Sequence, residues 1–512
     1  MDMVISTAPE ALERVIERVA AVCPHPADAL EAAAVLESLG YTDAVVRELT
    51  GQPDSRSLGR MLHTVMKAGH GAEPGPRLVP TRQGVRDELR VLLQTFSLSS
   101  IYALPWVVTF ALERRHPDVL QLPPEAAAPF TLALMLSLIV SGGFVQCIAR
   151  KGSFYIGLGQ HALGAAVTER IWQCGVATIA ATALMATSAA WYLDLFELRY
   201  AALGAGVYIM LGTFWLTCGV LWLERRYWQV PAAFGGAGAA FALCRAVHVS
   251  PLVSQILAVS VALGIALGLV AFAFSRHGAT AVGELASPRH AVLVRALAPY
   301  FCYGSGYFAF VFADRIAAGT SVPAAAGIEF AIDARYQAGM DAALLCFLLS
   351  MAAVEFINYR FVHFWQQEAS RWTPSAGVEY QARIQRRCVR SRALVAVAFV
   401  AIALLVLPVG RPTLTDPIAS RVMVLGLCGY LLLELGLFNA LVLFSVNAPV
   451  PVLRALVAGV MVNALGGYVS SNVFGSTYAA AAMCAGAAVF LWRSHVAVAV
   501  ALERPGYGCY VA

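Results

Sequence analysis

Long apolar runs dominate the chain after about residue 95. Each run holds roughly 20 residues rich in Ala, Leu, Val and Gly, and is bounded by charged residues, Pro or Gly, which is the length a helix needs to cross a hydrocarbon core of about 30 Å. Membrane-spanning strands would instead alternate apolar and polar positions over about ten residues. The runs therefore predict twelve transmembrane helices, at 95–112, 129–149, 171–193, 200–223, 229–248, 251–275, 291–313, 340–358, 393–410, 420–446, 450–473 and 475–498.

The first eighty residues have a different pattern. Runs such as ALERVIERVAAV and TDAVVRELTG repeat apolar residues at helical spacing, with Asp28 and Thr42 placed as N-caps and Gly40 and Gly51 placed as stops. A stretch rich in Pro and Gly, HGAEPGPRLVP, follows and is typical of a linker. Residues 1–80 are thus predicted to be a small cytosolic helical domain with its linker.

Composition agrees with a membrane protein. Of the 512 residues, 59% are hydrophobic and 13% charged, and the mean hydropathy is +0.68. A soluble protein of this length is more polar. The predicted fold class is all-α, a polytopic membrane protein of about twelve spans with a small N-terminal helical domain.

The basic residues predict an orientation. If the N-terminus is inside, the inner loops and tail hold eighteen Lys and Arg residues and the outer side holds eight. Basic loops stay on the cytoplasmic side during insertion, so both termini are predicted to be cytoplasmic and the protein multi-pass in the cytoplasmic (inner) membrane. The net charge of +5 reflects this bias and gives no reason to expect nucleic acid as a partner.

Motifs for cofactors, metals and covalent chemistry are missing. The chain has no GxxxxGK[ST], HExxH, GxSxG or EF-hand pattern, and its eleven cysteines form no CxxC pair. Because these motifs are missing, we expect no cofactor and no metal. We also expect no enzymatic activity, because the longest outer loop, about 314–339, is short for a catalytic domain. A membrane-embedded sugar transferase or polymerase, and a scaffold that recruits partners through its cytosolic domain, remain the alternatives.

Two ionisable residues inside predicted spans are candidates for function, Glu434 and Arg295. Glu434 is near mid-membrane, where a charge costs about 2.5–3.5 kcal/mol on insertion scales, so it either faces a transport cavity or bonds to a neighbouring helix through Asn439 or Asn463. Arg295 lies about one turn into the seventh span. It either extends to the cytoplasmic interface or lines a central cavity that attracts an anionic sugar or lipid phosphate.

The basic and aromatic segment from Arg360 to Arg392 joins the eighth and ninth spans. Its composition favours a helix lying on the anionic inner leaflet, with membrane lipids as partners; contact with a cytoplasmic protein is the alternative.

Several motifs, in this order, resemble those of the Pel exopolysaccharide transporter family, within the multidrug/oligosaccharidyl-lipid/polysaccharide exporter superfamily. Glu88-Leu89-Arg90 is followed by Pro105-Trp106 in the first span. Asp314-Arg315 ends the seventh span. Tyr336 leads into the eighth span, and Glu355 and Tyr359 stand at its end. The resemblance covers about residues 82–500. It departs from the family at Arg86-Asp87, at Ala103-Leu104 and in the additional domain 1–80.

The resemblance implies two six-helix halves, 82–275 and 276–500, with a cytoplasmic tail at 501–512. It implies a flippase or exporter of a polysaccharide or lipid-linked oligosaccharide, in which 95–275 rocks against 291–498, and a cytoplasmic glycosyltransferase as a possible partner for residues 1–80. Such alternating access needs no covalent chemistry. The candidate transport-path residues are Arg295, Asp314, Arg315, Tyr336, Glu355 and Glu434. Asp314 and Arg315 are expected at the outer mouth, where the seventh helix leaves the membrane, and are expected to pair with each other or with the following loop.

Overall fold

The computed structural model describes residues 8–23, 26, 29–69, 89–90, 93, 107–108, 122–158, 160–223, 228–277, 290–322, 330–371, 377–406 and 415–503. Every regular element in these ranges is a helix. The chain divides into two compact units, Met1–Gly84 and Val85–Ala512. The predicted first span, 95–112, and the tail after residue 503 lie almost wholly outside the described residues.

The N-terminal unit contains four helices around an apolar core. Val19, Leu36 and Leu58 are fully buried in that core. Gly40 and Gly51 both have positive φ, which is why glycine stops the helix at each of these positions. The helices are α1 (Ala8–Val22), α2 (Ala29–Ser38), α3 (Asp43–Thr50) and α4 (Ser55–Gly69).

Two carboxylates organise the start of α4. Asp54 caps the helix, because its Oδ1 accepts from the Ser57 backbone N–H at 2.6 Å, and Asp43 Oδ1 accepts from the Ser55 N–H at 2.8 Å. These bonds stabilise the charged form and so lower the pKa of both carboxyls. Thr42 precedes α3 as expected but makes no side-chain capping bond.

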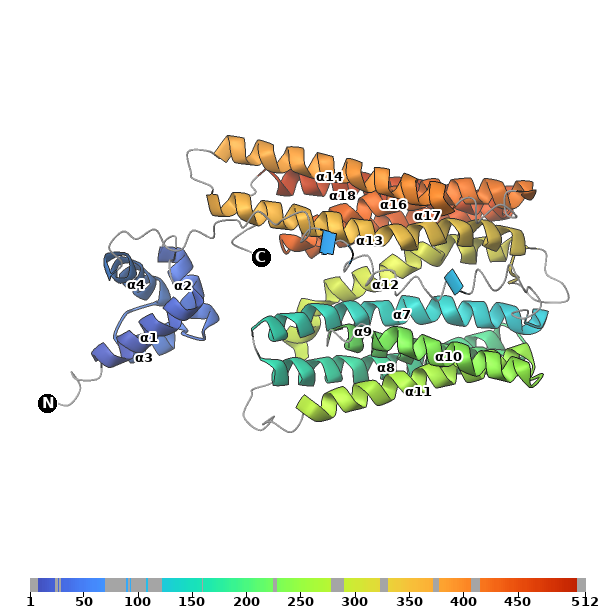
Figure 1. Cartoon of the computed structure of the whole chain (residues 1–512), viewed down its shortest axis with the longest axis horizontal. Coiled ribbons are helices and arrows are strands. Elements are labelled where there is room, and N and C mark those ends of the chain that lie inside the picture. Colours follow the sequence, from blue (N-terminus) through green and yellow to red (C-terminus); the bar gives the residue numbers. More distant parts are fainter. Residues whose placement is uncertain are drawn as a thin grey trace. The chain divides into compact units, whose positions relative to one another are not determined.

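The second unit is a bundle of long helices (Figure 1). Ten of its described helices are long and apolar enough to cross a membrane, and they overlap ten of the twelve predicted runs. The run 229–248 forms α10, which is not among the ten; its glycines and Arg245 lower its hydropathy. The helices are α7 (Pro124–Gly157), α8 (His161–Tyr192), α9 (Leu198–Leu223), α10 (Gln229–Ala246), α11 (Pro251–His277), α12 (His290–Thr320), α13 (Ala334–Arg371), α14 (Gly377–Val406), α16 (Pro417–Ser445), α17 (Pro449–Phe474) and α18 (Thr477–Ala501).

The bundle contains two groups of helices with α12 between them (Figure 1). Helices α7 to α11 form the first group, and α13, α14, α16, α17 and α18 form the second. The N-terminal part of α12, with Leu293 and Leu297, packs in the core of the first group. Its C-terminal part, with Phe310 and Phe312, packs in the core of the second. One helix therefore belongs to both cores.

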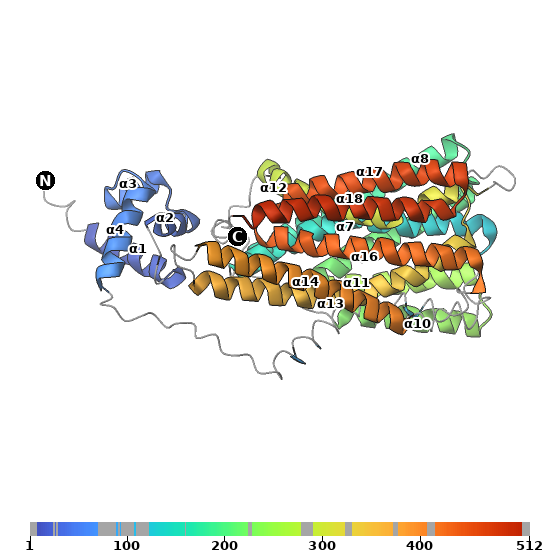
Figure 2. The same cartoon turned by 90° about the horizontal axis from the view of Figure 1, so that it is seen from above.

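Helices α13 and α14 extend beyond the rest of the second group (Figure 2). At about 1.5 Å per residue, the 38 residues of α13 span about 57 Å, more than a bilayer with its headgroups. The extension is a hairpin in which Trp365 Nε1 donates to Tyr380 Oη at 2.9 Å and Arg387 lies over the Phe364 ring at 5.3 Å. The expected separate surface helix between Arg360 and Arg392 is therefore wrong, because this segment continues the two spans.

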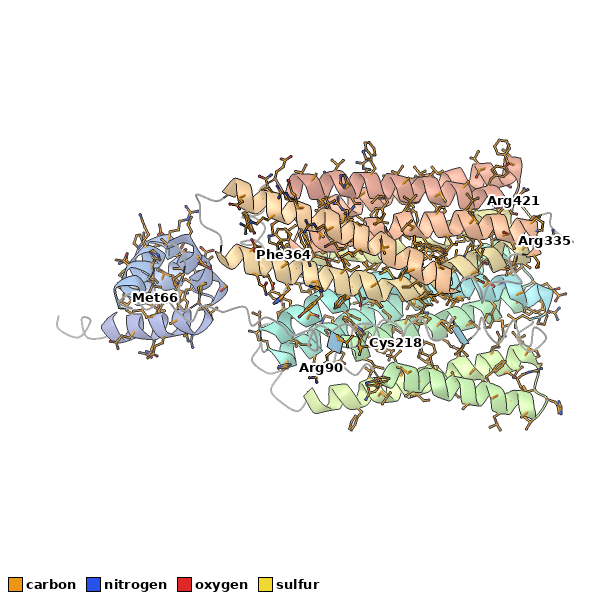
Figure 3. The ribbon with its side chains drawn as sticks, turned by 45° about the horizontal axis from the view of Figure 1, so that its top comes forward. Met66, Arg90, Cys218, Arg335, Phe364 and Arg421 are labelled. Carbon is orange, nitrogen blue, oxygen red and sulfur yellow. The ribbon has the colours of Figure 1, made fainter. Side chains whose placement is uncertain are left out.

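Basic side chains gather at one end of the bundle. The end where α7 finishes and α14 begins carries many arginines near helix ends, and we call it the arginine-rich end; its described members include Arg150, Arg170, Arg390, Arg454 and Arg493. Figure 3 shows Arg335 and Arg421 at the opposite end from Phe364 of the hairpin. The asymmetry is the one from which the orientation is predicted.

Candidate functional site

Four of the candidate path residues have buried ionisable side chains on α12, α13 and α16: Asp314, Arg315, Tyr336 and Glu434. Asp314 and Glu434 have no solvent-exposed surface, and Arg315 is 5% exposed. Asp314 and Arg315 do not end their helix, since α12 continues to Thr320. The expectation that the helix ends at this pair is therefore wrong: both side chains are inside the protein, about one and a half turns before Thr320.

The acid and the base on α12 have separate partners, both on the first turns of α13. The Tyr336 hydroxyl donates to Asp314 Oδ2 at 2.6 Å. Arg315 Nη1 donates to Asp341 Oδ1 at 2.6 Å and also bonds to Gln337 Oε1. Charge neutralisation of Arg315 thus comes from Asp341, while Asp314 is bonded to a neutral phenol.

Glu434 occupies a second polar position deeper in the same group. The Ser350 hydroxyl of α13 donates to Glu434 Oε2 at 2.7 Å. One turn earlier on α16, Tyr430 stacks on Phe347 with ring centroids 5.0 Å apart. Tyr430 is also near enough to Arg315 to interact with it electrostatically, so aromatic side chains fill the space between the two polar positions.

Several polar atoms in this region have no hydrogen-bond partner within the described part of the chain. They are Asp314 Oδ1, Glu434 Oε1, and Nε and Nη2 of Arg315. An unpaired buried polar atom costs about 1–3 kcal/mol, so a proton or a small cation would be favourable at the two carboxyl oxygens and a hydrogen-bond acceptor at the two Arg315 nitrogens. Across the same residues no three His, Cys, Asp or Glu side chains converge as a metal site.

The remaining candidates lie elsewhere. Arg295 is exposed near the start of α12, and Glu355 is exposed on α13. Glu88, Pro105 and Trp106 lie outside the described residues. Sequence reasoning missed Gln337 and Asp341, although their spacing of four residues places both on one face of a helix beside Tyr336.

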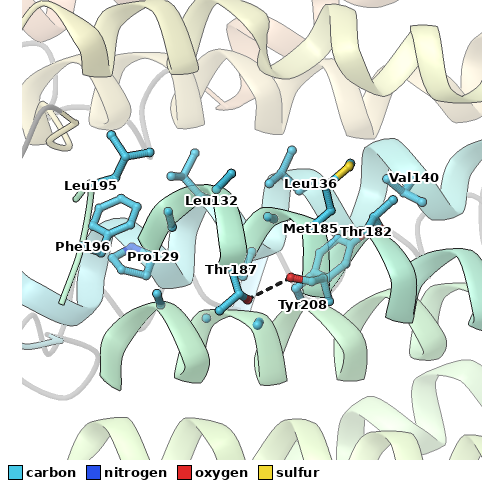
Figure 4. Close-up of a pocket in the computed structure, with 18 residues that line it drawn as sticks. Pro129, Leu132, Leu136, Val140, Thr182, Met185, Thr187, Leu195, Phe196 and Tyr208 are labelled. Carbon is cyan, nitrogen blue, oxygen red and sulfur yellow. Dashed lines mark hydrogen bonds between the residues drawn. The ribbon is translucent and has the colours of Figure 1, made fainter. Parts of the chain in front are cut away.

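The first group contains an apolar cavity of about 440 Å³ (Figure 4). It lies between α7, α8 and α9 and is lined by side chains such as Leu136, Met185 and Phe196. Thr182 and Tyr208 supply the main polar atoms, and their oxygens are 2.6 Å apart. Because these hydroxyls satisfy each other, the cavity suits an apolar group rather than a charged one.

The two groups meet through α7 and α12. Arg150 Nη2 donates to Asn447 Oδ1 at 2.9 Å, and the Tyr300 hydroxyl donates to the same oxygen at 3.2 Å. Farther along, Gly304 lies so close to Gly142 that a Cβ on Gly304 would be 2.8 Å from the carbonyl carbon of Gly142. The groups are therefore in contact toward the arginine-rich end through Arg150 and Asn447, and α7 meets α12 near the middle of both helices.

Comparison with solved structures identifies this arrangement. An outward-facing multidrug resistance MATE family transporter of the MOP superfamily aligns with a TM-score of 0.54 and 12% identity, over 80% of this chain and 96% of that one. The fold is that of a MATE transporter. A MOP superfamily transporter from Pyrococcus furiosus, described as having a binding pocket of reverse polarity, aligns with a TM-score of 0.53, 12% identity and the same coverage. An inward-facing MATE transporter aligns with a TM-score of 0.50 and 12% identity, over 80% of this chain and 95% of that one.

The match to the MATE fold covers most of this chain. The solved transporters are covered almost completely, while about a fifth of this chain lies outside the match. No protein-family model and no curated protein matches the sequence. The structural neighbours are transporters and not enzymes. Identities of 12% relate the chains by their MATE fold alone.

Proposed function

We propose that the protein is an exporter or flippase that moves a polysaccharide or a lipid-linked oligosaccharide across the bacterial inner membrane by alternating access. The observation that carries this proposal is the MATE fold over 80% of the chain, because transporters of this fold are solved in both outward-facing and inward-facing conformations. Two helix groups that pivot about a shared region can expose a site to each side in turn.

The contacts between the groups support such a motion. Helix α12 packs in both cores, so it can move with either group. The Arg150–Asn447 bond joins the groups toward the arginine-rich end, and the Gly142–Gly304 approach joins α7 to α12 near the middle of both helices. In the proposed cycle this end is closed in the present conformation, and breaking these few contacts opens it.

Energy coupling is assigned to the buried carboxyls. Glu434 and Asp314 are fully buried, each has one oxygen without a described partner, and neither forms an ion pair within the described chain. A carboxyl in this setting can take up and release a proton or a small cation, which is how a transporter without a nucleotide-binding motif draws on an ion gradient.

The substrate class rests on the resemblance to exopolysaccharide transporters carried by Asp314-Arg315, Tyr336, Glu355 and Tyr359. A cytoplasmic glycosyltransferase that delivers the polymer is part of the proposal. A small apolar compound is the second candidate substrate. It is favoured by the apolar cavity between α7, α8 and α9 and by the multidrug resistance transporters among the neighbours.

The test uses Glu434→Gln in a host whose own copy of the chain is deleted. Gln has the size of Glu and can still accept from Ser350, but it cannot ionise. We expect the variant to reach the membrane at normal levels and to lose surface polysaccharide at least tenfold, measured by sugar analysis of the cell surface. Glu169→Gln, which removes an exposed acid from α8 and no candidate path residue, is the matched control and should export normally.

Full export by Glu434→Gln would remove the coupling role. Surface polysaccharide that is unchanged by deletion of the whole chain would exclude the polymer as substrate. Sensitivity of the deleted host to apolar cytotoxic compounds would then favour the second candidate.

A further inference from the structure

Arg392 has an unusual environment on the inner side of α14. Its Nε donates to Asn439 Oδ1 of α16 at 2.8 Å, and its Nη1 is 2.6 Å from His495 Nδ1 of α18. Asn439 is fully buried, and its Nδ2 donates to the buried Ser494 hydroxyl at 3.1 Å. Three helices thus converge on one guanidinium, which is partly buried between them.

Every partner of this guanidinium is neutral. Guanidinium groups only donate, so His495 Nδ1 must accept, and the imidazole is the neutral tautomer that carries its proton on Nε2. Among the described residues no carboxylate forms an ion pair with Arg392. The positive charge is therefore uncompensated, while the Arg392 Nη2 and His495 Nε2 hydrogens remain as donors.

The residues around this cluster are of the kinds found at a membrane interface. Arg392 begins the apolar part of α14, where Leu394 and Val397 are exposed. Trp492, one turn from His495 on α18, is 66% exposed, and exposed tryptophans are typical of the membrane interface. Arg390 and Arg493 are exposed nearby and add positive charge.

We propose that Arg392, His495 and Asn439 form a binding site for the phosphate of an anionic phospholipid in the leaflet at the arginine-rich end. The phosphate would accept from Arg392 Nη2 and His495 Nε2, and one acyl chain would lie along the exposed apolar face of α14. Basic pockets between transmembrane helices recognise anionic headgroups in this way. The bound lipid would fasten α14 to α16 and α18 and stabilise the second group, independently of what the protein transports.

Native mass spectrometry of the full chain, with dioleoyl phosphatidylglycerol and dioleoyl phosphatidylcholine as probes, tests this site. We expect the tightest bound lipid to be phosphatidylglycerol. Arg392→Gln should weaken its affinity about five-fold, the contribution of one arginine near a membrane surface. Arg390→Gln, which removes an exposed arginine two residues away on α14, should change the affinity less than two-fold.

Two further arms keep the result decisive. If Arg392→Gln does not fold, His495→Phe takes its place, since His495 is exposed; the affinity should then fall about two- to three-fold. Inorganic phosphate at millimolar concentration should not displace the lipid. Equal losses for the Arg392 and Arg390 variants, no loss for the Arg392 and His495 variants, or displacement by inorganic phosphate would each overturn the proposal.

Discussion

Three buried side chains differ in whether their charge can change: Arg315 stays protonated, whereas the carboxyls of Asp314 and Glu434 can gain or lose a proton. Arg315 is always charged, and it is held by a carboxylate of its own, Asp341. Asp314 and Glu434 are held by hydroxyls, from Tyr336 and Ser350. A hydroxyl can donate to a carboxylate or accept from a carboxylic acid, so these two acids can change protonation without losing their partners. The arrangement suits groups that titrate during a transport cycle.

The Arg315–Asp341 pair predicts a large effect from a small substitution. Asp341→Ala leaves a guanidinium, whose side chain is 3% exposed, with Gln337 as its only described partner. We expect a loss of about 2 kcal/mol in the free energy of unfolding, less than the 3–5 kcal/mol for fully buried pairs because the Asp341 side chain keeps 29% exposure.

Denaturant titration in detergent measures this loss. Arg335→Ala is the control, because it removes an exposed ion pair with Asp416 at the same end of the bundle and should cost less than about 1 kcal/mol. Equal effects of the two substitutions would mean that Arg315 reaches solvent and that its pairing is not structural.

Among the elements, α7 and α12 depend on glycine for their contact. The carbonyl oxygen of Gly142 occupies the place where Gly304 would carry a Cβ. Backbones this close bring many atoms into van der Waals contact, which is the main source of attraction between helices in a lipid environment. The distance between α7 and α12 at this contact is therefore determined by two glycines rather than by large apolar side chains.

Gly304→Ala should push α7 and α12 apart at this contact. Its Cβ would lie 2.6 Å from Cγ of Gln146 as well as against the Gly142 backbone, so the helices must separate, at a cost of about 1–3 kcal/mol. Gly268→Ala on α11 meets no atom within 4 Å and should be neutral or slightly stabilising. Unfolding midpoints of the two variants in one detergent provide the comparison. A neutral Gly304→Ala would show that the helices are not in close contact in solution.

The sequence predicted which segments are helices more accurately than the residues at which those helices end. Apolar runs identify segments that must leave water, so they locate helices such as α16 and α17 closely. They do not report how far a helix continues beyond the membrane, and α13 continues to Arg371 because its polar turns pack on α14. Partners such as Ser350 and Glu434, 84 residues apart, could not be predicted, since their contact depends on how two helices pack.

At the scale of the whole membrane unit, basic side chains of the described residues gather at one end of the helix bundle. Contacts between the two groups, the hairpin of α13 and α14, and the Arg392 cluster all lie toward that end. The predicted orientation places it in the cytoplasm, because arginine-rich loops are retained there during insertion. The lipid site proposed at Arg392 would then lie in the inner leaflet.

Cysteine labelling tests this orientation. Arg371 ends α13 at the arginine-rich end, and Thr415 precedes α16 at the opposite end. In a chain whose native cysteines are replaced by Ala or Ser, Arg371→Cys should react with a membrane-impermeant maleimide only after the cells are opened, and Thr415→Cys should react in intact cells. Each position serves as the other's control for intactness of the membrane. Labelling of Arg371→Cys from outside would show that the orientation is the reverse of the predicted one. The contacts at the arginine-rich end would then close the outer side, and the starting conformation assumed for the export cycle would be wrong.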